Sequence, residues 1–478
     1  MSISQALNAA GSGLAAASRA IQVGTSNISN ALTPGYAPQS LTLASNGSVG
    51  SGVKVTGIDR KIDPVLQNLM RVSAAAHAEA EVSANFWSRI GAATGMPGDP
   101  GALSSLLDDL AESIRSAADR PDLENRLEDM LRSASQIVEK FADVETVIQQ
   151  QRANADGLIA RDVDTLNHGL ERLHRMNTEL AKLTAAGQPT MSVLDARDRL
   201  LQELSEIVPL VPRSKPDGQL SLHTKGGLSL LDVKPVVIGF QANPHIAAEM
   251  TIEGGQLSGL TVNGQPVTPP PGGALAGGRL AATFVIRDQE APGVQSQIDQ
   301  MAAGLITRFQ DPRTDPTLPS TEPGLFTDAG NRLGLPQVGL AGRLGLNPGV
   351  VPAAGGDLWK LRDGLGASAP GPVGQQEQLS RLLDAVNRPI SQGPGMPTRS
   401  LQQDVAALHS RLGSAQHASA TKLTATHAQH AELAQQDLAK GVDIDAEMQR
   451  LLLVETSYAA NARIIRVADD MLRRLLEI

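Results

Sequence analysis

The first thirty residues carry an apolar repeat that constrains the fold of the whole chain. Apolar or small side chains recur at alternating spacings of four and three residues: Ile3, Leu7, Ala10, Leu14, Ala17, Ile21, Gly24, Ile28 and Ala31. This 3.5-residue repeat predicts a helix that packs lengthwise against another helix as a coiled coil. Ser2 and Gln5 can form a capping box at its start, and Pro34-Gly35 ends it. Ala and Gly occupy several positions of this seam and offer little apolar surface, so the isolated helix is expected to be only marginally stable.

The last thirty residues carry a matching repeat. Its members are Leu451, Val454, Tyr458, Asn461, Ile465, Ala468, Leu472 and Leu475. Asn461 interrupts an apolar seam, which is typical of a residue that fixes the register of paired helices. A second apolar stripe lies beside the first and comprises Leu453, Ala460, Ile464, Val467, Met471 and Ile478. Asp443 can cap this helix at its N-terminus.

The two terminal segments have matching lengths. At 1.5 Å per residue, residues 3–31 span about 44 Å and residues 445–478 about 50 Å. Because the chain leaves the first helix at its C-terminal end and enters the last at its N-terminal end, we expect an antiparallel pair with both termini at one tip. An ordinary bundle closed by its termini is the alternative. A single pair cannot bury both stripes of the last helix, which indicates contacts with other subunits.

Between these ends, the pattern changes from helical to β and back. Long helices are predicted at residues 64–92, 103–120, 122–186 and 192–208. Five short runs separated by turn residues predict a small β module: Gln219–Thr224, Leu228–Leu231, Val236–Phe240, Glu249–Glu253 and Leu260–Val262. Helices resume at 279–310, 375–390 and from residue 399 onward.

We therefore predict a mainly α fold with an inserted β module. A terminal coiled-coil assembly domain comprises residues 1–45 and 440–478. A rod-like helical bundle comprises 46–208, 276–310 and 375–439. The β-rich insert at 209–275 faces outward, and an irregular Pro/Gly-rich connection occupies 311–374.

Composition excludes several function classes. A net charge of −9 provides no overall basic field for nucleic acid or anionic lipid. The absence of cysteine excludes disulfides, thiolate metal sites and cysteine nucleophiles. No apolar run is long enough to insert into a membrane, and the N-terminus does not resemble a cleavable secretory signal. Only 2% of residues are aromatic, which favours thin helical bundles over one large globule.

No catalytic constellation stands out, so we expect no catalytic residue, no cofactor site and no metal site. His409, His417, His427 and His430 fall on one helical stretch. His427 and His430 could share a metal, but a polar helix face is the favoured interpretation because no carboxylate stands at ligand spacing. Asp443, Asp445 and Glu447 resemble the start of a calcium loop that lacks its glycine and distal glutamate, which favours helix capping.

Residues 26–36, Ser-Asn-Ile-Ser-Asn-Ala-Leu-Thr-Pro-Gly-Tyr, resemble a signature shared by axial proteins of the bacterial flagellum. The matching positions are Asn27, Asn30, Thr33, Gly35 and Tyr36. Such proteins often carry Ser-Arg after the tyrosine, whereas this chain has Ala37-Pro38. The C-terminal segments 441–447, 458–465 and 468–472, with the interior segments 279–289 and 356–364, are similar to the flagellar hook-associated protein 1 family.

This resemblance implies a structural subunit that joins hook to filament. It implies export through the flagellar type III pathway, so that the chain is cytoplasmic before export and extracellular afterwards. It implies a homo-oligomeric ring-like layer next to the hook protein and the adjacent junction protein or filament, and a cytoplasmic export chaperone on the C-terminal helix. The alternatives are another axial subunit, of hook or distal-rod type, and a surface-appendage protein with an enzymatic insert.

We expect the terminal seams to carry assembly. The N-terminal seam is represented by Ile3, Leu7, Leu14, Ile21 and Ile28. The C-terminal seam is represented by Leu451, Val454, Tyr458, Asn461, Ile465, Leu472 and Leu475.

Overall fold

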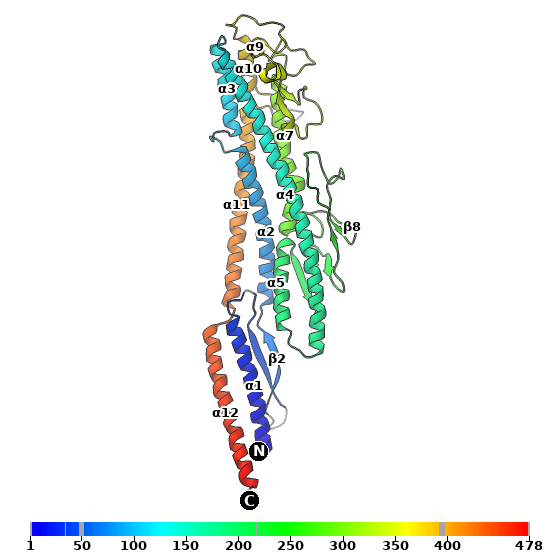
Figure 1. Cartoon of the computed structure of the whole chain (residues 1–478), viewed down its shortest axis with the longest axis vertical. Coiled ribbons are helices and arrows are strands. Elements are labelled where there is room, and N and C mark those ends of the chain that lie inside the picture. Colours follow the sequence, from blue (N-terminus) through cyan, green and yellow to red (C-terminus); the bar gives the residue numbers. More distant parts are fainter. Residues whose placement is uncertain (1, 34, 47–51, 217, 392–396, 477–478) are drawn as a thin grey trace.

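A computed structural model describes residues 2–33, 35–46, 52–216, 218–391 and 397–476 (Figure 1). The molecule is long and thin, and its long helices lie along the long axis. The predicted mainly α fold with an inserted β module is confirmed. Within the described ranges, no helix is both long and apolar enough to cross a membrane.

The two ends of the chain form the narrow end of the molecule. Helix α1 (Ile3–Ser29) lies beside α12 (Ile444–Leu476), and both termini lie at the same tip (Figure 1). The expected capping box is present at the start of α1, where Ser2 Oγ accepts from the Gln5 backbone and the Gln5 side chain accepts from the Ser2 backbone. Asp443 Oδ1 accepts from the Ala446 backbone N–H at 3.0 Å and caps α12 as predicted.

A β-hairpin follows α1, and the sequence analysis did not predict it. Strand β1 (Gln39–Ser45) pairs antiparallel with β2 (Val53–Arg60), and Ser12 Oγ accepts from the Val53 backbone N–H at 3.2 Å. The hairpin spans the domain boundary predicted at residue 45. The predicted division of the chain into domains otherwise stays a prediction.

The body of the molecule is a bundle of long helices. These are α2 (Pro64–Thr94), α3 (Leu103–Asp119), α4 (Glu124–Ala185), α5 (Met191–Ile207), α6 (Gly278–Val285), α7 (Ala291–Phe309), α10 (Glu377–Asn387) and α11 (Leu401–Ala439). Asp63 caps α2 by accepting from the backbones of Val65 and Leu66. The Ser400–Gln403 capping box starts α11.

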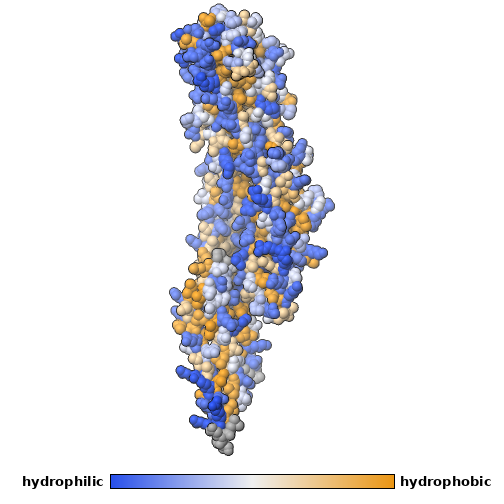
Figure 2. All heavy atoms as spheres, viewed as in Figure 1, coloured by the Kyte–Doolittle hydropathy of each residue, from blue (hydrophilic) through white to orange (hydrophobic). Residues whose placement is uncertain are grey.

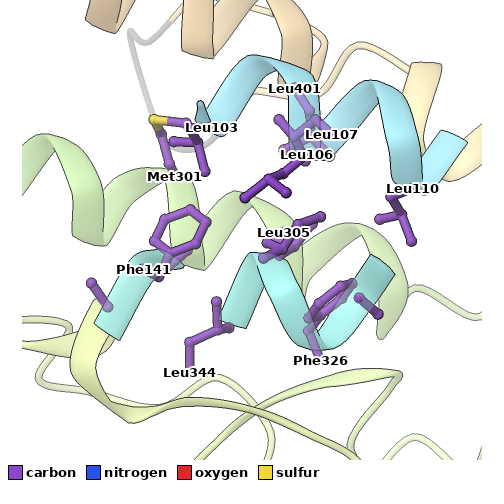
Figure 3. Packing of buried hydrophobic residues seen from close by; sticks show 14 of the residues in the cluster. Leu103, Leu106, Leu107, Leu110, Phe141, Met301, Leu305, Phe326, Leu344 and Leu401 are labelled. Atoms are coloured by element: carbon purple, nitrogen blue, oxygen red, sulfur yellow. The ribbon is translucent and has the colours of Figure 1, made fainter. Parts of the chain in front are cut away.

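Two apolar clusters hold the body together. In the first, shown in part in Figure 3, Leu107 of α3, Phe141 of α4 and Leu305 of α7 pack with residues of the short strands. In the second, Leu170 of α4 and Leu204 of α5 pack against Leu222 of the insert. The helix stripes predicted from the sequence therefore face the two apolar clusters, which hold the helices of the body together.

The insert contains two small antiparallel sheets. One comprises β3 (Leu210–Ser214), β4 (Leu220–Thr224) and β5 (Ser229–Leu231), and the other β6 (Ile238–Gly239), β7 (Thr261–Val262) and β8 (Gln265–Pro266). The strand predicted at 249–253 is wrong, because that segment forms turns. The Arg152 guanidinium donates to the carbonyls of Ala247, Ala248 and Met250, and the backbone N–H groups of Gly255 and Leu257 donate to Ile252 and Thr251, so the backbone closes turns in place of a strand.

The predicted helix at 279–310 is interrupted. Residues Ile286–Glu290 form a π-helical turn between α6 and α7. Residues 311–374 are mostly irregular as expected, but they include short elements. These are β9 (Phe326–Asp328), α8 (Leu340–Arg343), β10 (Leu344–Leu346), two 3-10 turns (Pro348–Val350 and Pro352–Ala354) and α9 (Trp359–Asp363).

Candidate functional site

The paired terminal helices approach each other closely and run antiparallel. A Cβ on Gly13 would lie 2.6 Å from Asn461 Nδ2, and a Cβ on Gly24 would lie 2.9 Å from Leu451 Cδ2. Further along, Asn27 Nδ2 donates to Glu447 Oε1 at 3.1 Å. Contacting residues with higher residue numbers on α1 meet residues with lower numbers on α12. The two helices are therefore antiparallel, as the chain connections predict. Glycine at positions 13 and 24 allows this approach, since no room remains for a side chain.

The contact line on α1 differs in detail from the predicted seam. Three small members of that seam, Ala10, Ala17 and Gly24, are buried, and the fourth, Ala31, is half-buried and follows the end of α1. Its larger members Ile3, Leu7, Leu14 and Ile28 are half-buried, and Ile21 is 36% exposed. The large side chains therefore flank the contact line, and the single chain leaves part of their surface open.

The predicted seam of α12 shows the same incomplete burial. Leu451, Val454, Asn461 and Ile465 are half-buried, and Ala468 is buried. Tyr458 is 44% exposed and Leu472 is 38% exposed. The side chain of Leu475 lies outside the described part of the chain.

Beyond the pair, α12 exposes a further set of apolar side chains. The exposed outer residues of α12 are Met448, Leu452, Leu453, Ile464, Val467 and Met471. Figure 2 shows apolar residues gathered over the lower part of the molecule, where α1 and α12 lie. A surface of this kind is typical of a site for other proteins, because monomers rarely leave a long apolar strip in water.

The motif residue Asn27 sits at the junction of the terminal helices with the hairpin. Its side chain is fully buried, and Nδ2 donates to the Gln39 carbonyl at 2.9 Å as well as to Glu447. Oδ1 accepts from the Tyr36 hydroxyl at 2.8 Å and from the Gln39 backbone N–H at 2.9 Å. One side chain thus ties together α1, the turn after it, β1 and α12.

The other motif residues shape the turn that follows α1. Asn30 Nδ2 donates to the Ser26 carbonyl at 2.9 Å, and Thr33 Oγ1 donates to Asn30 Oδ1 at 3.4 Å. Gly35 has φ +74°, and a Cβ there would lie 2.6 Å from Arg199 Cγ. The turn therefore needs glycine both for its conformation and for its approach to α5.

Tyr36 faces a partly buried, acidic environment. Burial raises the pKa of its phenol, and the charges of Asp195 and Glu447 raise it further, against the opposing effect of the hydrogen bond with Ser26. The phenol stays protonated and can donate to Asn27 at neutral pH.

Arg60 links the hairpin to the body, and the sequence analysis did not single it out. Its Nη2 lies 2.6 Å from Asp195 Oδ1 and 2.9 Å from Asp198 Oδ2, both on α5. Burial raises the pKa of Asp195, and the charge of Arg60 opposes that shift. These partners are more than a hundred residues apart in the chain, so no local pattern marks them.

The terminal helices and the body meet around a cavity of about 340 Å³. The chain passes this point at residues 35–38, 61–63 and 440–443, and the lining includes Tyr36, Arg60, Met70, Arg199 and Lys440. Lys440 Nζ pairs with Asp63 Oδ2 at 2.6 Å across it. We call this region the joint. Among the residues that the structure describes, no group of three or more histidine or carboxylate side chains could hold a metal ion.

Sequence families of known function match both ends and the interior of the chain. The model for "Flagella basal body rod protein" matches residues 7–36, and that for "Flagellar basal body rod FlgEFG protein C-terminal" matches 439–478. The model for "Flagellar hook-associated protein FlgK helical domain" matches 96–314. All three matched families are named as parts of the bacterial flagellum, so the chain is a flagellar component.

Individual relatives agree with these matches. Flagellar hook-associated protein 1 of Bacillus subtilis is 22% identical over 97% of this chain and 96% of its own length. The Escherichia coli protein of the same name is 23% identical over 64% of this chain and 56% of its own length, so the match spans little more than half of that relative. A solved structure, the flagellar hook junction protein FlgK from Burkholderia pseudomallei, aligns at 14% identity and TM-score 0.45, over 56% of this chain and 49% of that one. The chain therefore resembles the flagellar hook-associated protein 1 family, whose helical domain matches residues 96–314.

Proposed function

We propose that this protein is the structural subunit that joins the flagellar hook to the filament. The observation that carries the proposal is the match of the hook-associated helical domain to residues 96–314, between two ends that match general axial families. A hook or distal-rod subunit would share the two ends, but the helical domain between them favours the junction role. The proposal assigns the chain no catalytic step.

Assembly is proposed to use the terminal helices. The exposed outer residues of α12, together with the partly open Ile21, Tyr458 and Leu472, supply apolar surface that one copy leaves in water. Further copies of the chain, arranged as a ring-like layer, would cover it, with the hook protein on one side and the next junction protein or the filament on the other. Because heterologous contacts close into rings or open into helices, one repeated surface suffices for such a layer.

Export is proposed to use the flagellar type III pathway, so that the protein is cytoplasmic first and extracellular afterwards. The same exposed residues of α12 would need cover before export, which a cytoplasmic chaperone bound to the C-terminal helix provides. The contacts that Ala and Gly make along α1 bury little apolar surface, which supports export before assembly. The two ends of the chain can then stay unfolded until their partners bind.

The direct test is removal of the gene from its motile host, followed by electron microscopy. We expect hooks without filaments and filament protein released into the medium. Restoring the full chain restores filaments, and restoring a chain that lacks residues 440–478 does not. Filaments of normal length on cells that lack the protein would overturn the proposal.

A matched pair of variants tests the assembly surface. Replacing Leu452 and Leu453 by Gln removes exposed apolar surface from α12, and should reduce filament number while leaving the folded body unchanged. The control replaces Val233 and Val237 of the insert, which are 75% and 64% exposed, by Gln and should leave filaments unchanged. Equal filament numbers in both variants would contradict an assembly role for this surface.

A further inference from the structure

The contact between α2 and α11 is apolar near the start of α11 and polar further along the helix. Near the start of α11, Val405, Leu408 and Leu412 are buried in the core. From residue 413 to 439, Leu433 is the buried residue that remains among those described. Polar pairs take over there: Lys422 Nζ lies 2.7 Å from Glu79 Oε1, and Gln67 Nε2 donates to Asp437 Oδ1 at 3.1 Å. This part of α11 is held with little apolar burial, so its attachment depends on polar groups.

Three histidines meet in the middle of this polar contact. His77 of α2 lies against His427 and His430 of α11, with ring centroids 5.4 Å and 5.9 Å apart. His77 and His430 stack almost parallel, at 8°. The Nδ1 atoms of His77 and His430 are buried and have no hydrogen-bond partner. We call these three residues the histidine cluster.

The surroundings supply little compensation for added positive charge. Glu206 of α5 faces the cluster, but it also lies 3.9 Å from Arg279 of α6. On α2 and α11, Glu79 and Lys422 pair with each other, and the carboxylates of Glu81 and Glu432 are carried on the same two helices. His77 stacks on His430, and both His77 and His427 disfavour a positive charge on it.

The burial of His430 also disfavours its protonated form. Burial lowers its pKa, the neighbouring His77 and His427 lower it further, and Glu206 opposes the shift. A histidine with a lowered pKa in the closed form binds its proton more tightly when the contact opens. Closure is therefore fully favoured above the ordinary histidine pKa of 6.5, and it weakens as the pH falls below that value.

We propose that the histidine cluster is an acid-sensitive latch between α2 and α11. When its imidazoles take up protons, the α11 segment from residue 413 to 439 separates from α2. This segment leads directly into the joint and α12, so its release loosens the attachment of the C-terminal helix to the body. The latch goes beyond the proposed junction role and does not depend on it.

A distance measurement across the contact tests the latch in the full chain. Asn68 of α2 and Gln435 of α11 are exposed and lie at the level of the Gln67–Asp437 contact. Because the protein has no cysteine, Asn68→Cys and Gln435→Cys place spin labels at these two positions alone. Pulsed electron paramagnetic resonance then reports the distribution of label distances at about pH 7.5 and about pH 5.5.

We expect one short distance at the higher pH and a second, longer population at the lower pH. The ratio of open to closed molecules should rise several-fold, and about tenfold at most for each histidine that gains its proton on opening. The variant His77→Gln/His427→Gln/His430→Gln should stay closed at both pH values. The variant His417→Gln changes an exposed histidine of α11 outside the cluster and should open like the parent.

Two results would overturn the proposal. One is an unchanged distance distribution down to about pH 5.5, and the other is equal opening in the triple variant, which would assign the effect to carboxylates such as Asp437. If the triple variant does not fold, His430→Gln alone gives the same decision. It should reduce the acid-induced open population, and an open population equal to that of His417→Gln would rule the latch out.

Discussion

At the scale of the residue, Asn27 shows how one buried amide can organise a junction between distant segments. Its side chain has two donor hydrogens and two acceptor positions, and all four are used. The sequence motif marks Asn27 and Tyr36 as a pair, but it does not reveal their bond to each other. The contact with Glu447 joins residues 420 apart in the chain, which no local pattern can show.

The prediction at this scale is that Asn27→Asp weakens the joint. The substitution keeps the shape but replaces both donor hydrogens with an acceptor, and it places a negative charge beside Glu447. Each unmatched buried group costs about 1–3 kcal/mol, so α1 and α12 should lose most of their mutual stability. Hydrogen exchange of the α1 amides measures the loss. Asn8→Asp, at an exposed position of the same helix, is the control and should change little.

At the scale of the element, the terminal helices show what a heptad pattern can and cannot predict. The repeat on α1 correctly predicts a helix, Ser2 and Gln5 predict its cap, and the chain connections predict its antiparallel pairing with α12. The line of closest approach, however, runs through glycine and alanine, and the larger side chains flank it. A pattern based on apolar residues gives weight to the large ones, so the register of contact needed the structure.

Two glycines on α1 provide a matched prediction. Gly13→Ala should destabilise the α1–α12 pair, because its Cβ would lie 2.6 Å from Asn461 Nδ2. Gly11→Ala should stabilise α1 by about 1 kcal/mol, since nothing lies within 4 Å of a Cβ there and alanine favours helix. Urea denaturation, monitored through the hydrogen-exchange rates of the α1 amides, distinguishes the two variants. Equal stabilisation by both substitutions would show that the helices do not approach as described.

The insert offers a second prediction at the scale of the element. Arg152 is 1% exposed and donates to the Arg287 carbonyl as well as to the three carbonyls of the loop at 247–250. Arg152→Met should release that loop and leave its carbonyls without partners. We expect faster proteolysis within residues 241–257 while α4 stays helical by circular dichroism. Arg161→Met, at an exposed position of the same helix, is the control.

The hairpin β1–β2 and the failed strand at 249–253 show the limit of local patterns. The hairpin has alternating apolar positions, including Leu41, Leu43, Val53 and Val55, but it is short and stands between two long helices. The segment 249–253 has a similar alternation, but its backbone closes turns, and a guanidinium from α4 binds the Met250 carbonyl. For this segment, the outcome depends partly on a neighbour that is remote in sequence.

At the scale of the whole molecule, the order of elements could be predicted and the joint could not. Helix lengths and the change to β pattern follow from periodicity, and these place the body between the paired ends. The cavity at the joint arises where residues 35–38, 61–63 and 440–443 pass together, and Arg60 crosses from the hairpin to α5. Such a meeting of separate segments is a property of the tertiary structure.

The prediction at this scale concerns a chain that ends at residue 439. Both apolar clusters consist of residues from 86 to 412, so the body and insert should remain folded. α1 loses Leu451 and Glu447 as partners and should exchange its amides freely. We expect the body to unfold at an unchanged midpoint temperature. We expect the amides of residues 3–29 to lose their protection from hydrogen exchange. Retained protection of α1 would show that it is stable without α12.

The pairing of α1 with α12 also sets an order in time. These helices come from opposite ends of the described chain, and the contact from Asn27 to Glu447 closes a loop of 420 residues. Any process that delivers the chain one end first, whether synthesis or passage through a narrow channel, delivers one partner long before the other. The pair therefore forms last, and a chain stopped short lacks it altogether. The paired tip of the molecule forms only after both α1 and α12 have been delivered, so its surface is absent from a chain that stops before α12.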